Sequence, residues 1–305
     1  MRAFYSDTYL VPLPPGHRFP MQKYQAIRDR LLTSGLIAAT ELEEAPLAPR
    51  EALERVHTQG YLDALFALSL SKDEERRLGF PFTHALLARS RASVGGTLAA
   101  ARHALVSGVA GNLAGGTHHA FADHGEGYCV FNDLAVTVRT LQAERKIERA
   151  AVIDLDVHQG NGTAAIFEGD PNVFTFSMHG EHNFPFRKAR SSRDVGLADG
   201  TGDAEYLDLL ERHLVEVLEA SDPHLLIYQA GVDGLAEDAL GRLSLTHRGL
   251  YARDLLVLRT AWGRGIPVVL TLGGGYARPI EATVEAHLGT YRAAHEVFGD
   301  PHDSV

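Results

Sequence analysis

Short apolar runs separated by longer helical patterns constrain the fold of this chain more than any other feature. The runs are rich in Val, Ile, Leu or Phe and lack polar alternation; they are Ala150–Leu155, Val173–Met178, Leu225–Ala230 and Ile266–Leu272. Strands buried on both faces of a parallel sheet have this pattern, because neither face meets water. The runs therefore predict a parallel β-sheet.

The segments between these runs have helical periodicity. They are Ala204–Ser221, Gly249–Gly265 and Arg278–Gly299, and in the first of them Leu207, Leu210, Leu214 and Val217 form one apolar stripe. Strands that alternate with helices are typical of an α/β fold with helices on both faces of the sheet. No repeat or linker divides the chain, so residues 1–305 are expected to form a single domain.

Composition excludes several classes of protein. The formal net charge of −10 argues against a surface that binds nucleic-acid phosphates. Cys129 is the only cysteine, which excludes an intrachain disulfide and a cysteine-rich zinc site. No apolar run is long enough for a signal peptide or a membrane span, so we expect a cytoplasmic protein with no membrane partner.

Chemically capable side chains follow four of the predicted strands. The segments are Gly115–His119 after Ala110–Ala114, Asp154–His158 at the end of Ala150–Leu155, Gly231–Asp233 after Leu225–Ala230, and Gly273–Tyr276 after Ile266–Leu272. Ligands of open parallel sheets bind beyond the carboxyl ends of the strands. The four segments therefore predict one shared site at that edge.

Asp154, Asp156 and His158 alternate along one of these segments. In an extended chain, residues two apart point to the same side, which places both carboxylates and the imidazole together. Two carboxylates packed against an apolar strand repel each other and lose hydration unless a cation lies between them. The alternative is that one aspartate caps a helix over Gly162–Phe167 while the other faces solvent.

Asp156, His158 and Asp233 would supply oxygen and nitrogen ligands and leave one coordination position open. Three protein ligands plus water are typical of a catalytic zinc, although iron or cobalt also fits such a donor set. One histidine of the His118–His119 pair could take a proton from water, and Tyr276 could donate a hydrogen bond to an oxyanion. Taken singly, each histidine or the tyrosine could instead be a structural residue.

Four sequence segments resemble the signature segments of the histone deacetylase family. They are GGTHHAFADHGEGYCVFND (Gly115–Asp133), DLDVHQGNGT (Asp154–Thr163), QAGVD (Gln229–Asp233) and LGGGY (Leu272–Tyr276). The HQGNG version and the stretch His182–Leu207 are most similar to class IV members. The resemblance implies a three-layer α-β-α sandwich around a central, mostly parallel eight-stranded sheet.

The resemblance also implies roles for individual residues. Zinc would be bound by Asp156, His158 and Asp233. His119 would be the general base, and His118 would be its electrostatic partner, held by Asp154. Tyr276 would polarise the scissile carbonyl. The substrate would contact Gly127, Tyr128, Phe184 and Gly274, and a structural potassium ion would be bound by Asp154, Ser177 and the backbone carbonyls of Asp156, His158 and Met178.

Several positions depart from the family pattern. Asn161 stands where many members have an aspartate behind the general base, which should leave His119 neutral over a wider pH range. The stretch Leu78–His84 lacks the acidic rim residue with which some members bind the substrate backbone. The basic stretch Arg187–Arg193 has no helical or strand pattern and is interpreted as an exposed loop near the mouth of the pocket. Cys129 is either a pocket residue or a buried, inert thiol.

The sequence thus favours hydrolysis of acyl-lysine on a protein or peptide by metal-activated water. The alternative enzyme is a deacylase of a small acylated amine such as an acetylpolyamine. A ureohydrolase would need two metal sites, and a non-catalytic binder would have lost a ligand or the tyrosine. A preference for acyl groups longer than acetyl is also expected, because Gly273, Gly274 and Gly275 would leave room beside the reacting carbonyl. The oligomeric state stays open.

Overall fold

A computed structural model describes residues 1–299 of the chain. Its centre is an eight-stranded sheet in the order β2-β1-β3-β8-β7-β4-β5-β6, in which every pair of neighbours is parallel. The strands are β1 (Arg2–Tyr5), β2 (Leu42–Glu44), β3 (Val109–Asn112), β4 (Ala150–Asp154), β5 (Val173–Gly180), β6 (Arg193–Leu197), β7 (Leu225–Gln229) and β8 (Val268–Thr271).

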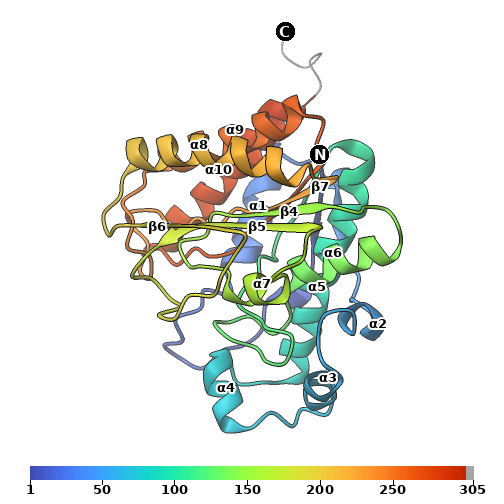
Figure 1. Ribbon diagram of the computed structural model, residues 1–305. Helices are drawn as coiled ribbons and strands as arrows, with labels where there is room; N and C mark the ends of the chain where they lie inside the picture. The colour runs from blue at the N-terminus through green and yellow to red at the C-terminus, as the bar shows by residue number, and fades with distance from the viewer. Residues whose placement is uncertain (300–305) are drawn as a thin grey trace.

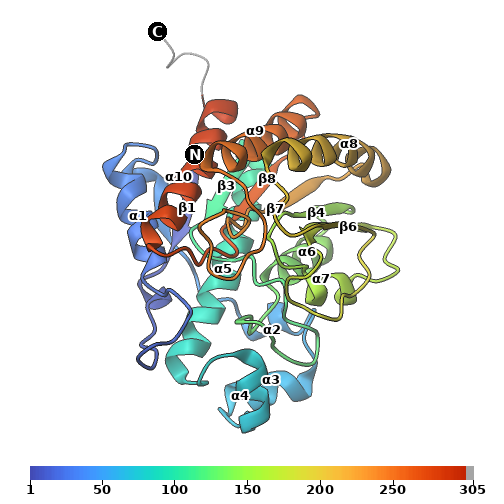
Figure 2. The same ribbon diagram turned by 90° about the vertical axis from the view of Figure 1, so that its left-hand side faces the viewer.

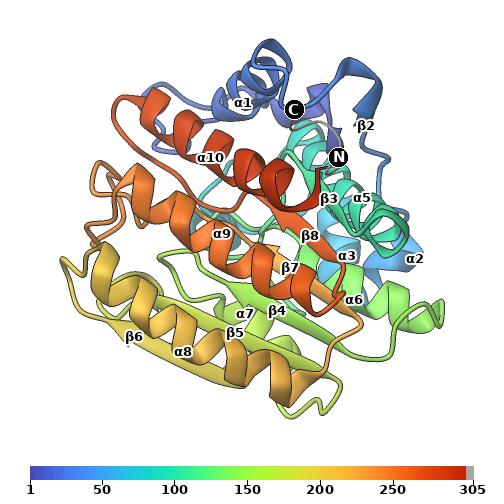
Figure 3. The same ribbon diagram turned by 90° about the horizontal axis from the view of Figure 1, so that it is seen from above.

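Helices cover both faces of the sheet, as Figure 1 shows. The α-helices are α1 (Lys23–Thr33), α2 (Arg50–Leu53), α3 (Gln59–Phe66), α4 (Lys72–Leu78), α5 (His84–Ser107), α6 (Asp133–Ala143), α7 (Asn161–Ile166), α8 (Asp203–Ser221), α9 (His247–Gly263) and α10 (Ile280–Phe298), with 3-10 turns η1 (Asp7–Tyr9) and η2 (Ala39–Glu41). Seen from above, α1, α10, α9 and α8 lie side by side over one face (Figure 3). The other face is covered by α5, α6 and α7, and α3 and α4 lie beyond them (Figure 2).

The predicted α/β sandwich is confirmed, and its sheet is all-parallel rather than mostly parallel. The apolar runs form β4, β5, β7 and β8, and every residue of β3, β4, β7 and β8 is buried. In α8, the stripe residues Leu210, Leu214 and Val217 are at most 1% exposed. The apolar pattern placed Leu207 in the buried stripe, but Leu207 is only half-buried. The buried residue at this level of the helix is its neighbour Tyr206.

The outer strands depart from the sequence interpretation. β6 begins at Arg193, so the end of the segment predicted to be an irregular basic loop is a strand. In β6, exposed or half-buried residues precede the one buried residue, Leu197, and β1 and β2 are also only partly covered. β2 and β6 are the two edge strands, and β1 lies next to β2. Strands at or next to the edge of a sheet are only partly covered and need no continuous apolar run, which is why the pattern missed them.

Strand order explains why the four predicted loops meet. β3, β8, β7 and β4 are neighbours in the sheet. Their last residues are also in register, because Asn112 pairs with Thr271, Thr271 with Gln229, and Gln229 with Asp154. The four segments that follow these residues therefore leave the sheet at one edge.

Within residues 1–299, none of the helices combines the length and the apolar character that a bilayer-crossing segment requires.

Candidate metal centre

Asp156, His158 and Asp233 converge in the loops that follow β4 and β7. One ligating atom from each lies within 4.8 Å of the other two, and all three side chains are buried. The Nδ1 atom of His158 lies 3.0 Å from Asp156 Oδ1 and 3.0 Å from Asp233 Oδ2. Two carboxylates and one imidazole around a single point are a donor set that zinc accepts, with a coordination position left open.

The electrostatics of this cluster call for a cation. Burial alone would lower the pKa of His158, but the charges of Asp233 and Asp156 outweigh it and raise that pKa to about 10. Burial and the charge of Asp156 raise the pKa of Asp233 to about 7. Carboxylates this close need positive charge between them, and a divalent metal ion would supply it, so the residues present fit the metal.

Backbone groups hold the carboxylates in place. Gly274 N–H donates to Asp156 Oδ2 at 2.7 Å, and Val157 N–H donates to Asp233 Oδ1 at 2.9 Å. A Cβ atom at Gly274 would collide with the Asp233 carboxylate. Glycine is therefore required at this position for close approach rather than for an unusual φ angle.

The alternative in which an aspartate caps the helix after β4 is not observed. The N-cap of α7 is Gly160, and no side chain accepts a hydrogen bond there. Asp154 is 3% exposed and accepts hydrogen bonds from the His118 ring and the Asp156 backbone instead.

The His118–His119 pair lies directly beside the cluster. The His118 Nδ1–H group donates to Asp154 Oδ2 at 2.6 Å, and the His119 Nδ1–H group donates to Asn161 Oδ1 at 2.8 Å. The Asn161 amide nitrogen donates to Glu126 at 2.9 Å, which fixes its oxygen toward His119. The Nε2 atom of His119 is therefore the nitrogen left to accept a proton.

The two histidines differ in protonation. Burial would lower the pKa of His118, but Asp154 and Asp156 raise it to about 9, so this ring is charged at neutral pH. Burial and the charge of His118 hold the pKa of His119 well below its usual value. This direction agrees with the expectation of a neutral His119, although burial is the main cause and the hydrogen bond to Asn161 raises the pKa.

Buried Asp133 holds the loop that carries the histidine pair. Its carboxylate accepts hydrogen bonds from the backbone N–H groups of Gly116 and Thr117 and from the hydroxyls of Thr117 and Thr97. Asp133 occupies the first turn of α6, so this helix and the histidine loop are fixed relative to each other.

Tyr276 is positioned by two residues that sequence reasoning missed. Its backbone N–H group donates to Asp238 Oδ2 at 2.6 Å, and the buried Lys23 donates to Gly273 O at 3.0 Å. The Lys23 ammonium also lies 5.3 Å from the centre of the Tyr276 ring. Burial and the nearby carboxylates raise the pKa of Tyr276, which keeps the phenol protonated as a donor. No local pattern singles out Lys23 or Asp238.

A channel leads from the surface to the metal cluster. Its outer part has a volume of about 550 Å³, and among its lining residues are His119, Gly127, Tyr128, His158, Phe184 and Tyr276. The Phe184 and His119 ring centres lie 4.9 Å apart. Gly127 has φ +55°, and a Cβ there would lie 2.7 Å from His119 Cδ2, so only glycine leaves the channel open.

The inner end of the channel is a cavity of about 40 Å³ whose lining includes Gly274, Arg89 and Cys129. The Cys129 thiol is buried, which raises its pKa, so it is a wall of the cavity in its unreactive protonated form. Arg89 was not singled out from the sequence. It is 4% exposed, and its guanidinium lies 5.0 Å from the centre of the Tyr24 ring.

The residues expected to bind potassium lie on two paired strands. Asp154 of β4 pairs with Ser177 of β5, and Met178 follows Ser177. The Ser177 hydroxyl is also 2.9 Å from His179 Nδ1.

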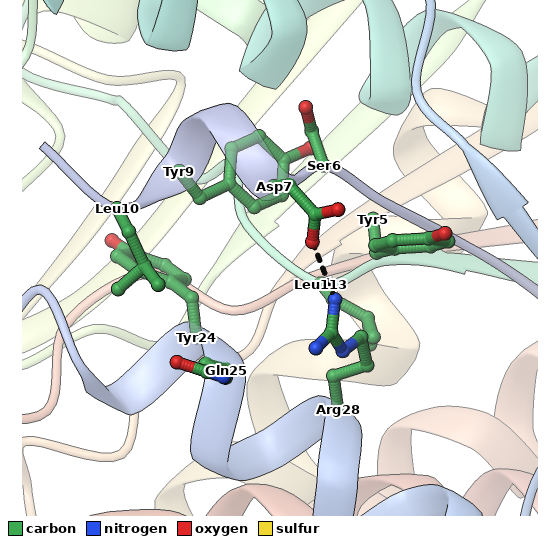
Figure 4. A pocket seen from close by; sticks show the side chains of 9 residues that line it. All are labelled: Tyr5, Ser6, Asp7, Tyr9, Leu10, Tyr24, Gln25, Arg28 and Leu113. Atoms are coloured by element: carbon green, nitrogen blue, oxygen red, sulfur yellow. Dashed lines mark hydrogen bonds and ion pairs between the residues drawn. The ribbon is translucent and has the colours of Figure 1, made fainter.

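A second small cavity lies near the N-terminus, between η1 and α1 (Figure 4). It measures about 40 Å³, and Arg28 pairs with Asp7 there at 2.6 Å. Asp7 is the one carboxylate that lines it within the described part of the chain, so it is no second metal centre.

Comparison with known proteins identifies relatives over most of the chain. Residues 17–290 match the family model described as "Histone deacetylase domain". The chain is 33% identical to "Histone deacetylase 2" of Arabidopsis thaliana, over 92% of this chain and 77% of that protein. It is 31% identical to the "Histone deacetylase-like amidohydrolase" of Pseudomonas aeruginosa, over 87% of this chain and 74% of that one.

A solved structure has the same architecture. The crystal structure of a histone deacetylase homologue complexed with SAHA superimposes with a TM-score of 0.82 and 26% identity. The match covers 98% of this chain and 84% of that one.

Proposed function

Because this chain belongs to the histone deacetylase family, we propose that it is a zinc-dependent deacylase that hydrolyses the amide of acyl-lysine side chains. The chain is a histone deacetylase-like amidohydrolase with a buried Asp-His-Asp metal site. The observation that carries the proposal is the convergence of this metal site with a neutral His119 and a protonated Tyr276 at the inner end of one channel.

Zinc would be held by Asp156, His158 and Asp233. When bound, it supplies a Lewis acid that polarises a carbonyl oxygen and lowers the pKa of water to about 7. The rest of the chemistry belongs to side chains of the protein.

His119 would act as the general base, since its Nε2 is free and its ring is neutral. His118, charged through Asp154, would stabilise negative charge that develops in the transition state. The Tyr276 phenol would donate a hydrogen bond to the oxyanion of the attacked amide. Asp238 and Lys23 hold the Tyr276 loop in the position that this hydrogen bond requires.

The channel would receive the lysyl chain. Tyr128 and Phe184 would flank its methylenes, and the carbonyl of Gly127 would accept the substrate N–H. Gly274 would line the space for the acyl group. These contacts are transferred from the family resemblance, and the location of all four residues along the channel supports them.

The inner cavity favours a short acyl group, in contrast to the sequence expectation of a longer one. One water molecule needs about 10–15 Å³ of such volume, so a cavity of about 40 Å³ has room for an acetyl group but not for a fatty chain. The glycine run leaves no extra space. A Cβ at Gly273 would meet Gln229, one at Gly274 would meet Asp233, and one at Gly275 would meet Thr283.

Two finer features are transferred from the resemblance. One is a structural potassium ion bound by Asp154, Ser177 and the backbone of Asp156, His158 and Met178, which the pairing of Asp154 with Ser177 supports. The other is a relationship to class IV members, which the HQGNG segment supports.

Hydrolysis of a peptide series tests the proposal. Zinc-loaded protein should release acyl groups from lysine, with kcat/KM highest for acetyl and lower for octanoyl and myristoyl versions of one peptide. Chelation should abolish turnover and zinc should restore it. Turnover that survives complete chelation would exclude the metal mechanism. A kcat/KM that is highest for the myristoyl peptide would show that the inner cavity opens well beyond about 40 Å³.

A further inference from the structure

The mouth of the channel is basic although the chain as a whole is acidic. Arg18, Arg76, Arg77 and Arg242 line the outer cavity, whereas Glu126 is the one carboxylate that lines it within residues 1–299. Glu126 already accepts a hydrogen bond from Asn161. The formal net charge of the chain is −10, so a cluster of arginines at this mouth runs against the overall charge.

Among residues 1–299, two of these arginines have no carboxylate within ion-pair distance. Arg76 pairs with Asp73 at 2.8 Å, and Arg242 pairs with Asp199 at 3.1 Å. Arg18 and Arg77 are exposed, and no carboxylate of the described residues lies within 4.0 Å of either guanidinium. Their positive charge is available to a ligand.

The backbone fixes Arg77 beside the channel wall. Gly127 N–H donates to Arg77 O at 3.3 Å, and Tyr128 N–H donates to Leu78 O at 2.8 Å. The end of α4 is therefore tied to the two residues proposed to contact the lysyl chain. A Cβ at Gly79 would lie 2.8 Å from the Tyr128 ring, which shows how closely this helix end approaches it.

Arg18 is fixed to the same wall through its neighbour His17. The His17 Nε2 atom is within 2.9 Å of Gly79 O, and its ring lies 5.4 Å from Phe80 and 5.9 Å from Tyr128. The two unpaired guanidinium groups thus belong to segments that are packed against each other and against Tyr128.

We propose that this mouth selects an acyl-lysine substrate whose immediate surroundings carry carboxylates. The inference rests on the proposed function and adds the class of substrate. The carboxylate could belong to Asp or Glu residues that flank the acyl-lysine in a peptide, or to the free α-carboxylate of acyl-lysine itself. Guanidinium groups bind carboxylates with directional, charge-assisted hydrogen bonds. The same charge disfavours a polycationic substrate such as an acetylpolyamine.

Peptide binding tests this inference independently of turnover. Five fluorescent ligands are added to the zinc-loaded His119→Ala protein, and their binding is followed by anisotropy. Three are peptides with acetyl-lysine flanked by Asp, by Ala or by Lys, and two are single acetyl-lysine with a free α-carboxylate and its α-amide. The Asp-flanked peptide should bind about tenfold more tightly than the Lys-flanked one at low salt, and the difference should shrink as salt is added. Tighter binding of the single acetyl-lysine than of its α-amide would identify that carboxylate as the source.

Charge-reversal variants test the two arginines against a matched control. Arg18→Glu/Arg77→Glu should reverse the order of the Asp- and Lys-flanked peptides. Arg145 is an exposed residue between α6 and β4, at the amino ends of the strands and therefore away from the channel. The control variant Arg145→Glu should leave the order of the two peptides unchanged. If the double variant does not fold, Arg77→Ala should reduce the preference. Equal affinity of the wild-type mouth for both peptides would overturn the inference, whereas failure of wild-type protein to hydrolyse the Ala-flanked peptide would overturn the proposed function.

Discussion

Each residue proposed to take part in catalysis is held by a partner that lies far from it in the sequence. Asp154 holds His118, Asn161 holds His119, and Asp238 holds the backbone of Tyr276. Partners of this kind fix the direction of a proton donor or acceptor and set its charge. Substitution of a reactive group and substitution of a metal ligand should therefore have different signatures.

Replacement of the proposed general base, His119, should separate proton transfer from metal binding. His119→Ala should retain about one zinc per chain and lose roughly 100-fold or more in kcat, since a positioned base is removed while the ligands stay. Asp156→Ala is the matched comparison and should lose both zinc and turnover. Metal content by mass spectrometry and steady-state kinetics measure the two effects. Equal loss of zinc in both variants would show that His119 belongs to the metal site.

Loss of the phenol hydroxyl should affect the transition state. Tyr276→Phe keeps the ring and its contacts but removes one oxyanion donor, which is worth about 2.7–4 kcal/mol. We expect kcat to fall roughly 100-fold or more while KM changes little. Tyr251→Phe, on α9 away from the channel, serves as the control and should keep full turnover. A fall of less than threefold in the Tyr276 variant would assign the tyrosine a structural role.

Four neighbouring strands that end in register act as the frame of the site. Because β3, β8, β7 and β4 stop at the same level, the loops after them converge without long connections. The loop after β8 comes so close to the carboxylates that the Gly274 N–H group donates to Asp156 and a Cβ atom at Gly274 would collide with Asp233. The geometry of the metal centre therefore depends on how closely the loop after β8 approaches the loops after β4 and β7.

One added methyl group in this loop should disrupt the metal centre. Gly274→Ala would push a Cβ into the Asp233 carboxylate and should reduce both zinc content and turnover. Gly263→Ala, at the end of α9 with nothing within 4 Å of its Cβ position, is the control and should keep both. Zinc content and kcat/KM of the two variants decide the comparison. Full zinc occupancy in Gly274→Ala would mean that the loop can shift outward at little cost.

Metal binding should stabilise the whole molecule, because the buried carboxylates repel each other without a cation. A ligand that binds only the folded state at about 1,000 times its Kd contributes about 4 kcal/mol. For a chain of this length, that corresponds to roughly 5–10 °C in Tm.

Calorimetry with and without a chelator measures this linkage. Chelation should lower the Tm of the wild-type protein, and zinc should restore it. Asp156→Ala should have a Tm that does not respond to zinc. A wild-type Tm that is unchanged by chelation would mean that the carboxylates are already neutralised in the metal-free protein.

The sequence by itself determined the central strands, the helices α8, α9 and α10, and the residues of the metal centre. These features are local: a strand buried on both faces needs a continuous apolar run, and the chemistry that follows β3, β4, β7 and β8 lies next to those runs in the chain. Tertiary structure alone decided the order β3-β8-β7-β4, the outer strands β1, β2 and β6, and the small volume of the inner cavity. It also decided the roles of Lys23, Asp238 and the arginines at the mouth. Strand order and cavity volume depend on contacts between segments far apart in the chain, and half-exposed strands and single buried charges leave no periodic signal in the sequence.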